Sequence, residues 1–198
     1  MRIISGTAAN VILKVPKGYD VRPTPDLVRQ AIFNSLGDRV VNARVLELFG
    51  GTGALSLECL SRGAASAVCI ELAQRHARMI RDNLADTGIP QHLFDLRVQD
   101  VLVAIPHLAQ AGAQFDLIMA DPPFGEKNMG RRSTSFSQKL LDHELLPGLL
   151  ADDGMFVLGH TKRDNVTLTD AWEERKLMKH GDSQMRFLVK KTPVPPAA

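Results

Sequence analysis

The sequence predicts an α/β fold in which a mostly parallel, seven-stranded sheet carries helices on both faces. From about residue 41, short β-prone runs alternate with helical patterns, and repeated β–α units build parallel sheets. The run at 115–121 is continuously apolar, as in a strand covered on both faces. With 198 residues, 44% of them hydrophobic and 23% charged, the chain fits one globular domain of this kind.

The expected elements follow one another along the chain. Strands are expected at 43–49, 66–71, 94–98, 115–121 and 155–160. Helices are expected after the glycines to about Arg62, from Ala73 to Ala85, in a short stretch that Pro106 interrupts, and at about 136–150. Two further β-prone runs near 175–179 and 184–190 predict a closing hairpin.

The first 40 residues are expected to form an appendage to a main domain at 41–192. The runs at 2–5 and 11–15 predict a β-hairpin, and a helix with apolar spacing follows as far as Leu36. Thr24 is a good N-cap for that helix, and Pro25 suits its first position. The Pro-rich residues 193–198 are expected to be a frayed tail.

Composition excludes several classes of protein. Two cysteines, Cys59 and Cys69, are too few for a disulfide scaffold or a Cys-rich zinc site. The six histidines lack metal-ligand spacing, so we expect no metal. No stretch has the length and hydropathy of a signal peptide or a membrane span. We therefore expect a cytoplasmic protein, without membrane contact, that is a monomer.

Positive charge is concentrated in three segments, although the chain as a whole carries only +2. Residues 1–36 carry +3, residues 127–139 carry +4 and residues 161–198 carry +3, which leaves −8 for the remainder. Three basic segments on one face would bind a polyanion such as a nucleic acid. The alternative is that they are solvated loops and helix faces.

The strand at 43–49 leads into the motif Glu47-Leu48-Phe49-Gly50-Gly51-Thr52-Gly53. Glycines allow a tight turn and close approach to a ligand, and the following helix offers free N–H groups. A dinucleotide site would have a third glycine where Ser56 stands. A carboxylate at Glu47 would repel a pyrophosphate but attract a cationic amino-acid group, which favours S-adenosylmethionine. The alternative is a simple strand-to-helix turn.

Acidic residues also follow the next two strands. Glu71, with Leu72 beside it, stands where a carboxylate accepts the two ribose hydroxyls of an adenosine. Asp100 and Val101 stand where an adenine amino group would lie. A capping role at the start of the next helix is nearly as good an explanation of Asp100.

The motif Asp121-Pro122-Pro123-Phe124 ends the strand at 115–121. Successive prolines fix the backbone and leave its carbonyls free to accept hydrogen bonds. The Asp121 carboxylate and the Pro122 carbonyl would hold the two hydrogens of an exocyclic amine, and Phe124 would stack on the ring that bears it. The alternative is a plain turn.

These motifs resemble those of class I S-adenosylmethionine-dependent methyltransferases that modify amino groups on planar rings. The segments RPTPDLVRQAIFNSL (22–36) and ELFGGTGALSLECLSRGA (47–64) are similar to the bacterial 16S ribosomal RNA guanine-N2 methyltransferase family. The resemblance implies a Rossmann-like methyltransferase fold, S-adenosylmethionine as cofactor, and 16S ribosomal RNA or a small-subunit ribosomal particle as partner.

The resemblance also implies the site residues. The cofactor pocket would comprise Glu47, Phe49, Gly50, Gly51, Thr52, Gly53, Glu71, Leu72, Asp100, Val101 and Asp121. Asp121, Pro122 and Phe124 would be catalytic. The substrate would meet Arg22, Thr24, Pro123, Phe124, Arg131 and Arg132.

The chain departs from the family in two places. A polar loop at 125–135 precedes the next helix, and Gly159-His160 ends the strand at 155–160, where the family often has an acidic residue. Two alternatives remain open. The motif at 121–124 also suits an N6-adenine DNA methyltransferase, and the same fold could serve as a non-catalytic nucleic-acid-binding module.

Overall fold

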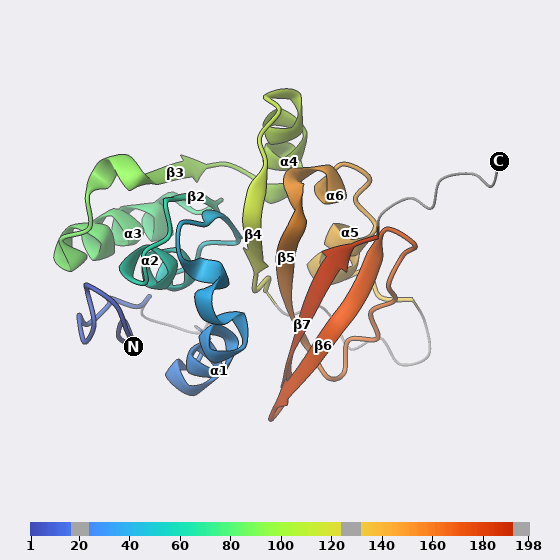
Figure 1. Cartoon of the computed structure of the whole chain (residues 1–198), viewed down its shortest axis with the longest axis horizontal. Helices are drawn as coiled ribbons and strands as arrows, with labels where there is room; N and C mark the ends of the chain where they lie inside the picture. Colours follow the sequence, from blue (N-terminus) through green and yellow to red (C-terminus); the bar gives the residue numbers. More distant parts are fainter. Residues whose placement is uncertain (17–23, 124–131, 192–198) are drawn as a thin grey trace.

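The computed structural model describes residues 1–16, 24–123 and 132–191 and contains the expected seven-stranded sheet, with strand order β3-β2-β1-β4-β5-β7-β6 (Figure 1). Strands β1 to β5 pair in parallel, and β7 is antiparallel to both β5 and β6. The strands are β1 (Arg44–Leu48), β2 (Ser66–Glu71), β3 (Phe94–Val98), β4 (Phe115–Ala120), β5 (Leu150–Thr161), β6 (Trp172–His180) and β7 (Ser183–Lys190). The mostly parallel sheet predicted from the sequence is confirmed.

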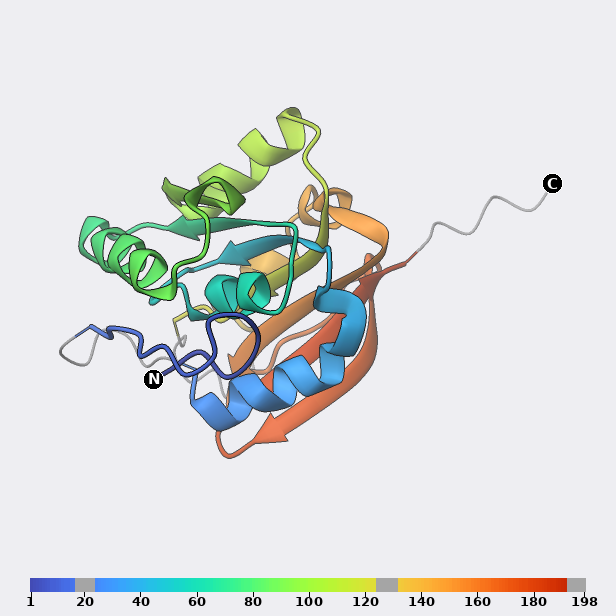
Figure 2. The ribbon, with the colours of Figure 1, turned by 60° about the vertical axis from the view of Figure 1, so that its left-hand side comes forward.

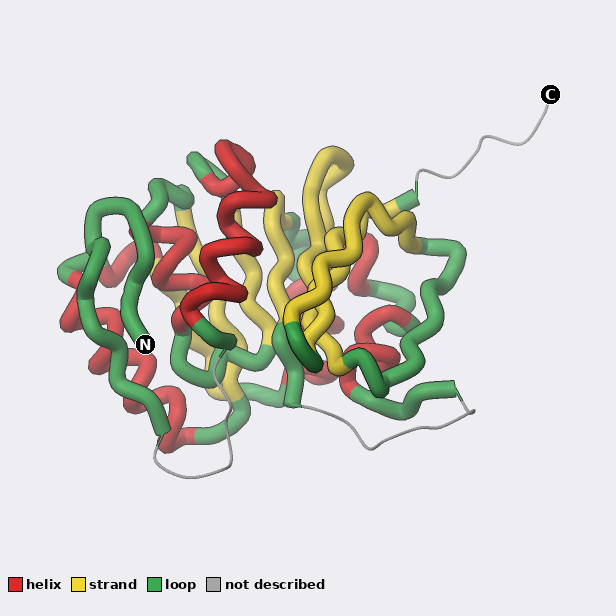
Figure 3. The backbone as a smooth tube through the Cα atoms, turned by 90° about the horizontal axis from the view of Figure 1, so that it is seen from below, coloured by secondary structure: helices red, strands yellow, loops and turns green. Residues whose placement is uncertain are grey.

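Helices cover both faces of this sheet (Figure 3). They are α1 (Asp26–Leu36), α2 (Ala54–Ser61), α3 (Gln74–Thr87), α4 (Val101–Gln110), α5 (Phe136–Leu141) and α6 (Leu146–Leu149), with short 3₁₀ turns at Gly37–Val40 and Gln91–Leu93. Alternate strand residues divide between two cores: Val45 packs with α1, α2 and α3, whereas Leu46 packs with α4, α5 and α6. Period-two alternation of buried side chains on both faces explains why the central strands are apolar throughout.

The N-terminal segment, residues 1–16, packs against the domain. As predicted, the runs at 2–5 and 11–15 lie antiparallel: Arg2 and Ile12 form a bridge, and the Ile3 amide donates to the Val11 carbonyl (2.9 Å). The Glu58 side chain of α2 accepts hydrogen bonds from the amides of Ile4 (2.7 Å) and Ser5 (3.1 Å), which therefore do not serve a strand ladder. Figure 2 shows the segment, in dark blue, lying against α2. Residues 1–16 and 24–40 thus share a core with the sheet.

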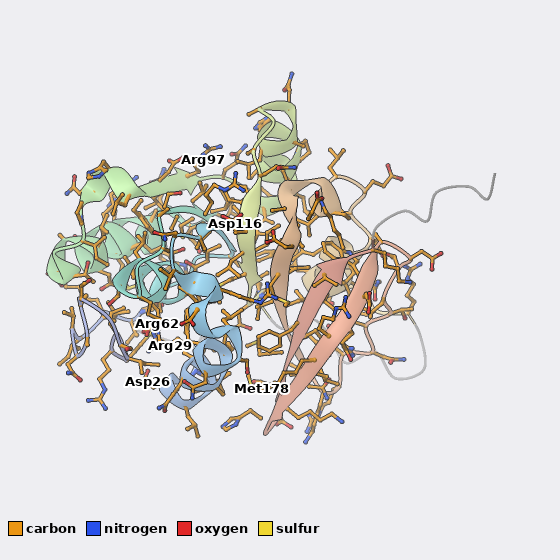
Figure 4. The ribbon with its side chains drawn as sticks, in the orientation of Figure 1. Asp26, Arg29, Arg62, Arg97, Asp116 and Met178 are labelled. Carbon is orange, nitrogen blue, oxygen red and sulfur yellow. The ribbon has the colours of Figure 1, made fainter. Side chains whose placement is uncertain are left out.

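A buried cation ties α1 to this segment. Arg29 is fully buried, and its Nη2 atom donates to Asp26 Oδ1 (2.8 Å) and to the carbonyl of Arg2. Glu58 of α2 lies 3.9 Å from Nη1 and also accepts from Arg62 (2.7 Å). Asp26, Arg29 and Arg62 lie together beside α1 in Figure 4. Because a buried charge is tolerated only with partners, this cluster fixes α1 against α2.

Two helices differ from their prediction. Helix α4 runs through Pro106 without interruption, because Ile105 and Leu108 on either side of the proline are buried against the sheet. The helix expected at about 136–150 is divided into α5 and α6. Pro147 lies in the first turn of α6, where its missing N–H leaves no hydrogen bond unmade.

Candidate active site

The carboxyl ends of four parallel strands converge at the point where the strand order reverses. Leu48 at the end of β1 pairs with Ile70 of β2 and with Ala120 of β4. Glu71 ends β2 and pairs with Val98 at the end of β3. Ligands of open α/β sheets bind in the crevice at such a switch point. The register therefore brings the motifs predicted after β1, β2, β3 and β4 to one edge of the sheet.

The loop after β1 adopts a backbone that side chains rarely allow. Gly51 and Gly53 have φ angles of 57° and 73°, and Phe49, which is not a glycine, has φ 63°. A Cβ atom on Gly50 would lie 2.4 Å from Cys69 Sγ, so only glycine fits against β2. Non-glycine residues with a positive φ angle cluster at functional sites, where the surrounding structure holds them in that conformation. The ring of Phe49 is held by Phe136 of α5, with centroids 5.2 Å apart.

Glu71 closes this loop. Its Oε2 atom accepts from the Gly51 amide (2.7 Å) and its Oε1 atom from the Ala73 amide (2.8 Å), with His76 Nδ1 at 3.4 Å. The Oε2 atom, with one partner, has a second lone pair and so retains capacity for a ligand hydroxyl. Leu72 beside it is 65% exposed, an apolar side chain open at the same strand end. Glu71 and Leu72 therefore lie at the crevice, as predicted, and their contacts with a ligand stay a prediction.

Glu47 lies beneath the loop. The side chain is 2% exposed and accepts from the amide of Ser56 in α2 (3.0 Å). Burial raises the pKa of the Glu47 carboxyl to about 7, against the hydrogen bonds from Ser56 and Cys69 that lower it. The carboxylate is directed at the helix start that carries the loop. Its predicted contact with an amino-acid group of a ligand is untested.

After β3, the structure shows the capping role for Asp100. Its Oδ1 atom accepts from the Leu102 amide (2.7 Å) at the start of α4. The other oxygen is not used by this cap, so an adenine contact is compatible with it. Val101 is 4% exposed and belongs to the core, which leaves little of its side chain for a ligand.

Asp121 directly follows β4 and is held by residues from distant segments. Thr24 Oγ1 donates to Asp121 Oδ2 (2.5 Å) across 97 residues of sequence. The prediction that Thr24 caps α1 is wrong, because Pro25 is the N-cap and no side chain caps the helix. Burial raises the pKa of Asp121, and the Thr24 hydrogen bond opposes that rise. Pro122 is buried and Pro123 exposed.

Gly159 of β5 forms the other wall around Asp121. A Cβ atom at Gly159 would lie 2.4 Å from Asp121 Oδ1. Neither Thr24 nor Gly159 was predicted to be a neighbour of this carboxylate. The only sequence signal in β5 was Gly159-His160, which stands where the family often has an acidic residue.

His160 forms a separate polar chain inside β5. It is 3% exposed, its Nδ1 atom bonds to the Thr161 carbonyl (2.8 Å), and its Nε2 atom accepts from Arg186 Nε (2.9 Å). Arg186 pairs in turn with Glu174. Burial, and then the Arg186 charge, lower the pKa of His160. The ring is therefore a satisfied neutral group of the sheet.

Three predicted residues, Arg22, Phe124 and Arg131, lie outside the described residues. Arg132 is described, and its exposed side chain pairs with Asp142 (2.6 Å). Among the described residues, no group of three or more His, Cys, Asp or Glu could hold a metal ion. In the same part of the chain, no helix has the length and apolar character needed to cross a membrane.

The chain is similar in sequence to curated bacterial proteins. Over 128 residues the chain is 38% identical to ribosomal RNA small subunit methyltransferase D of Escherichia coli, a match that covers 63% of this chain and 60% of the relative. The chain thus spans about 60% of the length of the first curated relatives it matches. It is 31% identical to "Putative rRNA methyltransferase YlbH" of Bacillus subtilis, over 82% of this chain and 83% of that protein.

Solved structures have a similar fold. The structure titled "Putative methyltransferase yhhF from Escherichia coli" superposes with a TM-score of 0.77 at 30% identity, covering 96% of this chain and 98% of that one. A hypothetical protein of Thermus thermophilus gives a TM-score of 0.78 at 28% identity, over 96% and 99% of the two chains. The class I methyltransferase fold and the resemblance to bacterial ribosomal RNA methyltransferases are thereby confirmed.

The family model described as "Conserved hypothetical protein 95" matches residues 1–189, nearly the whole chain. A match of that extent includes the N-terminal segment, the glycine loop and the Asp121 motif together. The chain belongs to this family.

Proposed function

We propose that this chain transfers a methyl group from S-adenosylmethionine to the exocyclic N2 amine of a guanine in 16S ribosomal RNA. The observation that carries the proposal is the position of Asp121, at the carboxyl end of β4, beside the glycine loop and held by Thr24. The names of the relatives, as methyltransferases of ribosomal RNA, support the same chemistry and substrate class.

The residues at the switch point fit the cofactor. The loop at Gly50–Gly53 presents backbone without side chains, Glu71 and Asp100 retain acceptor capacity for a nucleoside, and Leu72 offers an exposed apolar surface. When bound there, S-adenosylmethionine would supply an electrophilic methyl group. The fit needs no metal ligand.

Asp121 and the Pro122 carbonyl would orient the amine. Guanine N2 is a weak nucleophile because its lone pair is delocalised into the ring. Two acceptors on its hydrogens would favour a pyramidal nitrogen, and the Asp121 carboxylate would stabilise the positive charge that develops there. The amine is thereby placed in line for transfer. Phe124, on sequence grounds alone, would stack on the base.

The test is methyl transfer by the purified chain, with Asp121→Asn and Glu71→Ala as variants. Substrates are small-subunit ribosomal particles, naked 16S RNA and duplex DNA, and the modified nucleoside is identified by mass spectrometry. We expect N2-methylguanine from an RNA substrate, and a loss of about a hundredfold or more in kcat with Asp121→Asn. Glu71→Ala should instead weaken S-adenosylmethionine binding about tenfold or more in calorimetry.

Asp116→Asn is the matched control. It removes a carboxylate from the same strand, in β4, where it pairs with Arg44 (2.9 Å). Its activity should match that of the parent. Methyl transfer by Asp121→Asn at the parental rate would exclude the amine-orienting role, and methylation of DNA alone would favour the adenine alternative.

A further inference from the structure

The Asp121 carboxylate is seated between two segments that the chain brings from opposite directions. Gly159 of β5 leaves the space that Asp121 Oδ1 occupies, since a Cβ there would be 2.4 Å from that oxygen. On the other side, Thr24 Oγ1 donates to Oδ2 at 2.5 Å. Oδ1 makes no hydrogen bond to the described residues, so it is the oxygen left to receive an incoming donor.

The Thr24 hydroxyl is not needed by its own helix. A threonine immediately before a helix start ordinarily accepts from the amides of the first turn. Here α1 begins after Pro25 without any side-chain cap, and the hydroxyl donates to Asp121 instead. The contact is therefore not a by-product of capping.

We propose that Thr24 is a positioning residue for Asp121: its hydroxyl fixes the carboxylate rotamer and directs Oδ1 at the substrate amine. This inference rests on the proposed function, because it assigns a task to Thr24 only if Asp121 receives the amine. A substrate-binding role for Thr24, as the sequence suggested, would be a different role. The hydroxyl is already engaged with Asp121.

The titratable groups on the neighbouring strands are bonded to other partners. On β1, Glu47 accepts from the Ser56 amide, and on β5, His160 is bonded to Thr161 and Arg186. Burial raises the pKa of Asp121, and the Thr24 hydrogen bond is what lowers it. Removing the hydroxyl should therefore raise the pKa of Asp121 further.

The experiment compares Thr24→Val, which keeps the shape and removes the donor, with Thr24→Ser, which keeps the donor. Methyl transfer is measured at saturating S-adenosylmethionine from pH 5 to 9, and cofactor affinity by calorimetry. We expect kcat to fall about tenfold in Thr24→Val, as for a lost hydrogen bond to a charged group. Its acidic limb should move to higher pH, while Thr24→Ser stays close to the parent in both respects. Cofactor affinity should be unchanged in both variants.

Two kinetic outcomes would overturn the proposal. One is a parental rate and pH profile in Thr24→Val. The other is an equal loss in Val and Ser variants, which would mean that the threonine only packs.

A direct titration separates this inference from the proposed function. The ¹³C signal of the Asp121 carboxyl, assigned with Asp121→Asn, reports its pKa without any turnover. A higher pKa in Thr24→Val alone supports the contact even if the parent methylates none of the substrates tested, in which case the proposed function fails. An unchanged pKa in Thr24→Val refutes the positioning role whatever the activity.

Discussion

At the scale of single residues, Glu47 links the candidate site to the stability of the fold. Its carboxyl is buried under the glycine loop, and burial raises its pKa from 4.5 to about 7. The folded state therefore retains a proton that the unfolded chain releases between these values. The resulting stabilisation is complete below pH 4.5 and is lost as the pH rises through 7, and the gap corresponds to about 3 kcal/mol.

We predict that Glu47→Gln removes this pH dependence. Between pH 5 and 7.5, the free energy of unfolding of the parent should fall relative to that of Glu47→Gln, by about 2 kcal/mol. Urea unfolding of both proteins at each pH measures the difference. The contribution of His160, whose lowered pKa makes stability rise with pH, is the same in both proteins and cancels in the comparison. Parallel curves for the two proteins would show that Glu47 is ionised in the fold at neutral pH.

At the scale of elements, α3 joins the glycine loop to the N-terminal segment through one side chain. Asn83 is fully buried; its Oδ1 atom accepts from the Lys14 amide (2.7 Å), and its Nδ2 atom donates to the carbonyls of Lys14 (3.1 Å) and Thr52 (2.9 Å). In both segments, these backbone groups find their hydrogen-bond partner in α3. The loop after β1 is thus held by Glu71, which accepts from Gly51, and by Asn83, which donates to Thr52. Glu47 holds the start of the helix that follows the loop.

We predict that Asn83→Ala destabilises the protein by about 3 kcal/mol, because it leaves buried backbone groups without partners. Amide exchange should accelerate at Thr52–Gly53 and near Lys14. The matched controls are Asp82→Ala and Asp86→Ala, which remove only exposed ion pairs of Lys14 (3.9 and 3.0 Å) and should leave stability close to that of the parent. Unchanged exchange at Thr52 in Asn83→Ala would show that the loop is held without α3.

At the scale of the whole molecule, the three basic segments are predicted to bind the phosphates of the proposed RNA substrate. In the segment at 127–139, however, Arg132 already forms an ion pair with Asp142. Exposed ion pairs are weak, so a phosphate can take over the guanidinium. Arg131 is adjacent in sequence but lies outside the described residues.

We predict that Arg131→Ala and Arg132→Ala together weaken RNA binding and flatten its salt dependence by about two phosphate contacts. Asp142→Asn should act in the opposite direction by freeing Arg132. Filter binding from about 50 to 300 mM salt measures both effects. If the slope were unchanged in the double variant, this segment would be a solvated loop.

Local patterns in the chain were enough to predict the sheet, its parallel centre and the residues at its strand ends. Apolar runs and β–α alternation are local signals, and a parallel sheet brings all carboxyl ends to one edge, so Glu71 and Asp121 could be placed at the same site without coordinates. The glycine loop was found for the same reason. Phe49 in a left-handed conformation was not, because no local pattern predicts strain in a non-glycine residue.

The support of these residues, in contrast, depends on contacts that exist only in the folded protein. Thr24 was predicted to cap a helix and instead bonds to Asp121, 97 residues away. Gly159 borders the same carboxylate because β4 and β5 are paired, and Asn83 reaches Thr52 because α3 packs over the loop. Local sequence encodes the conformations a segment prefers, whereas these contacts join segments whose proximity exists only once the sheet has formed. For that reason, the residues at the strand ends could be predicted from the chain, and the contacts that position them could not.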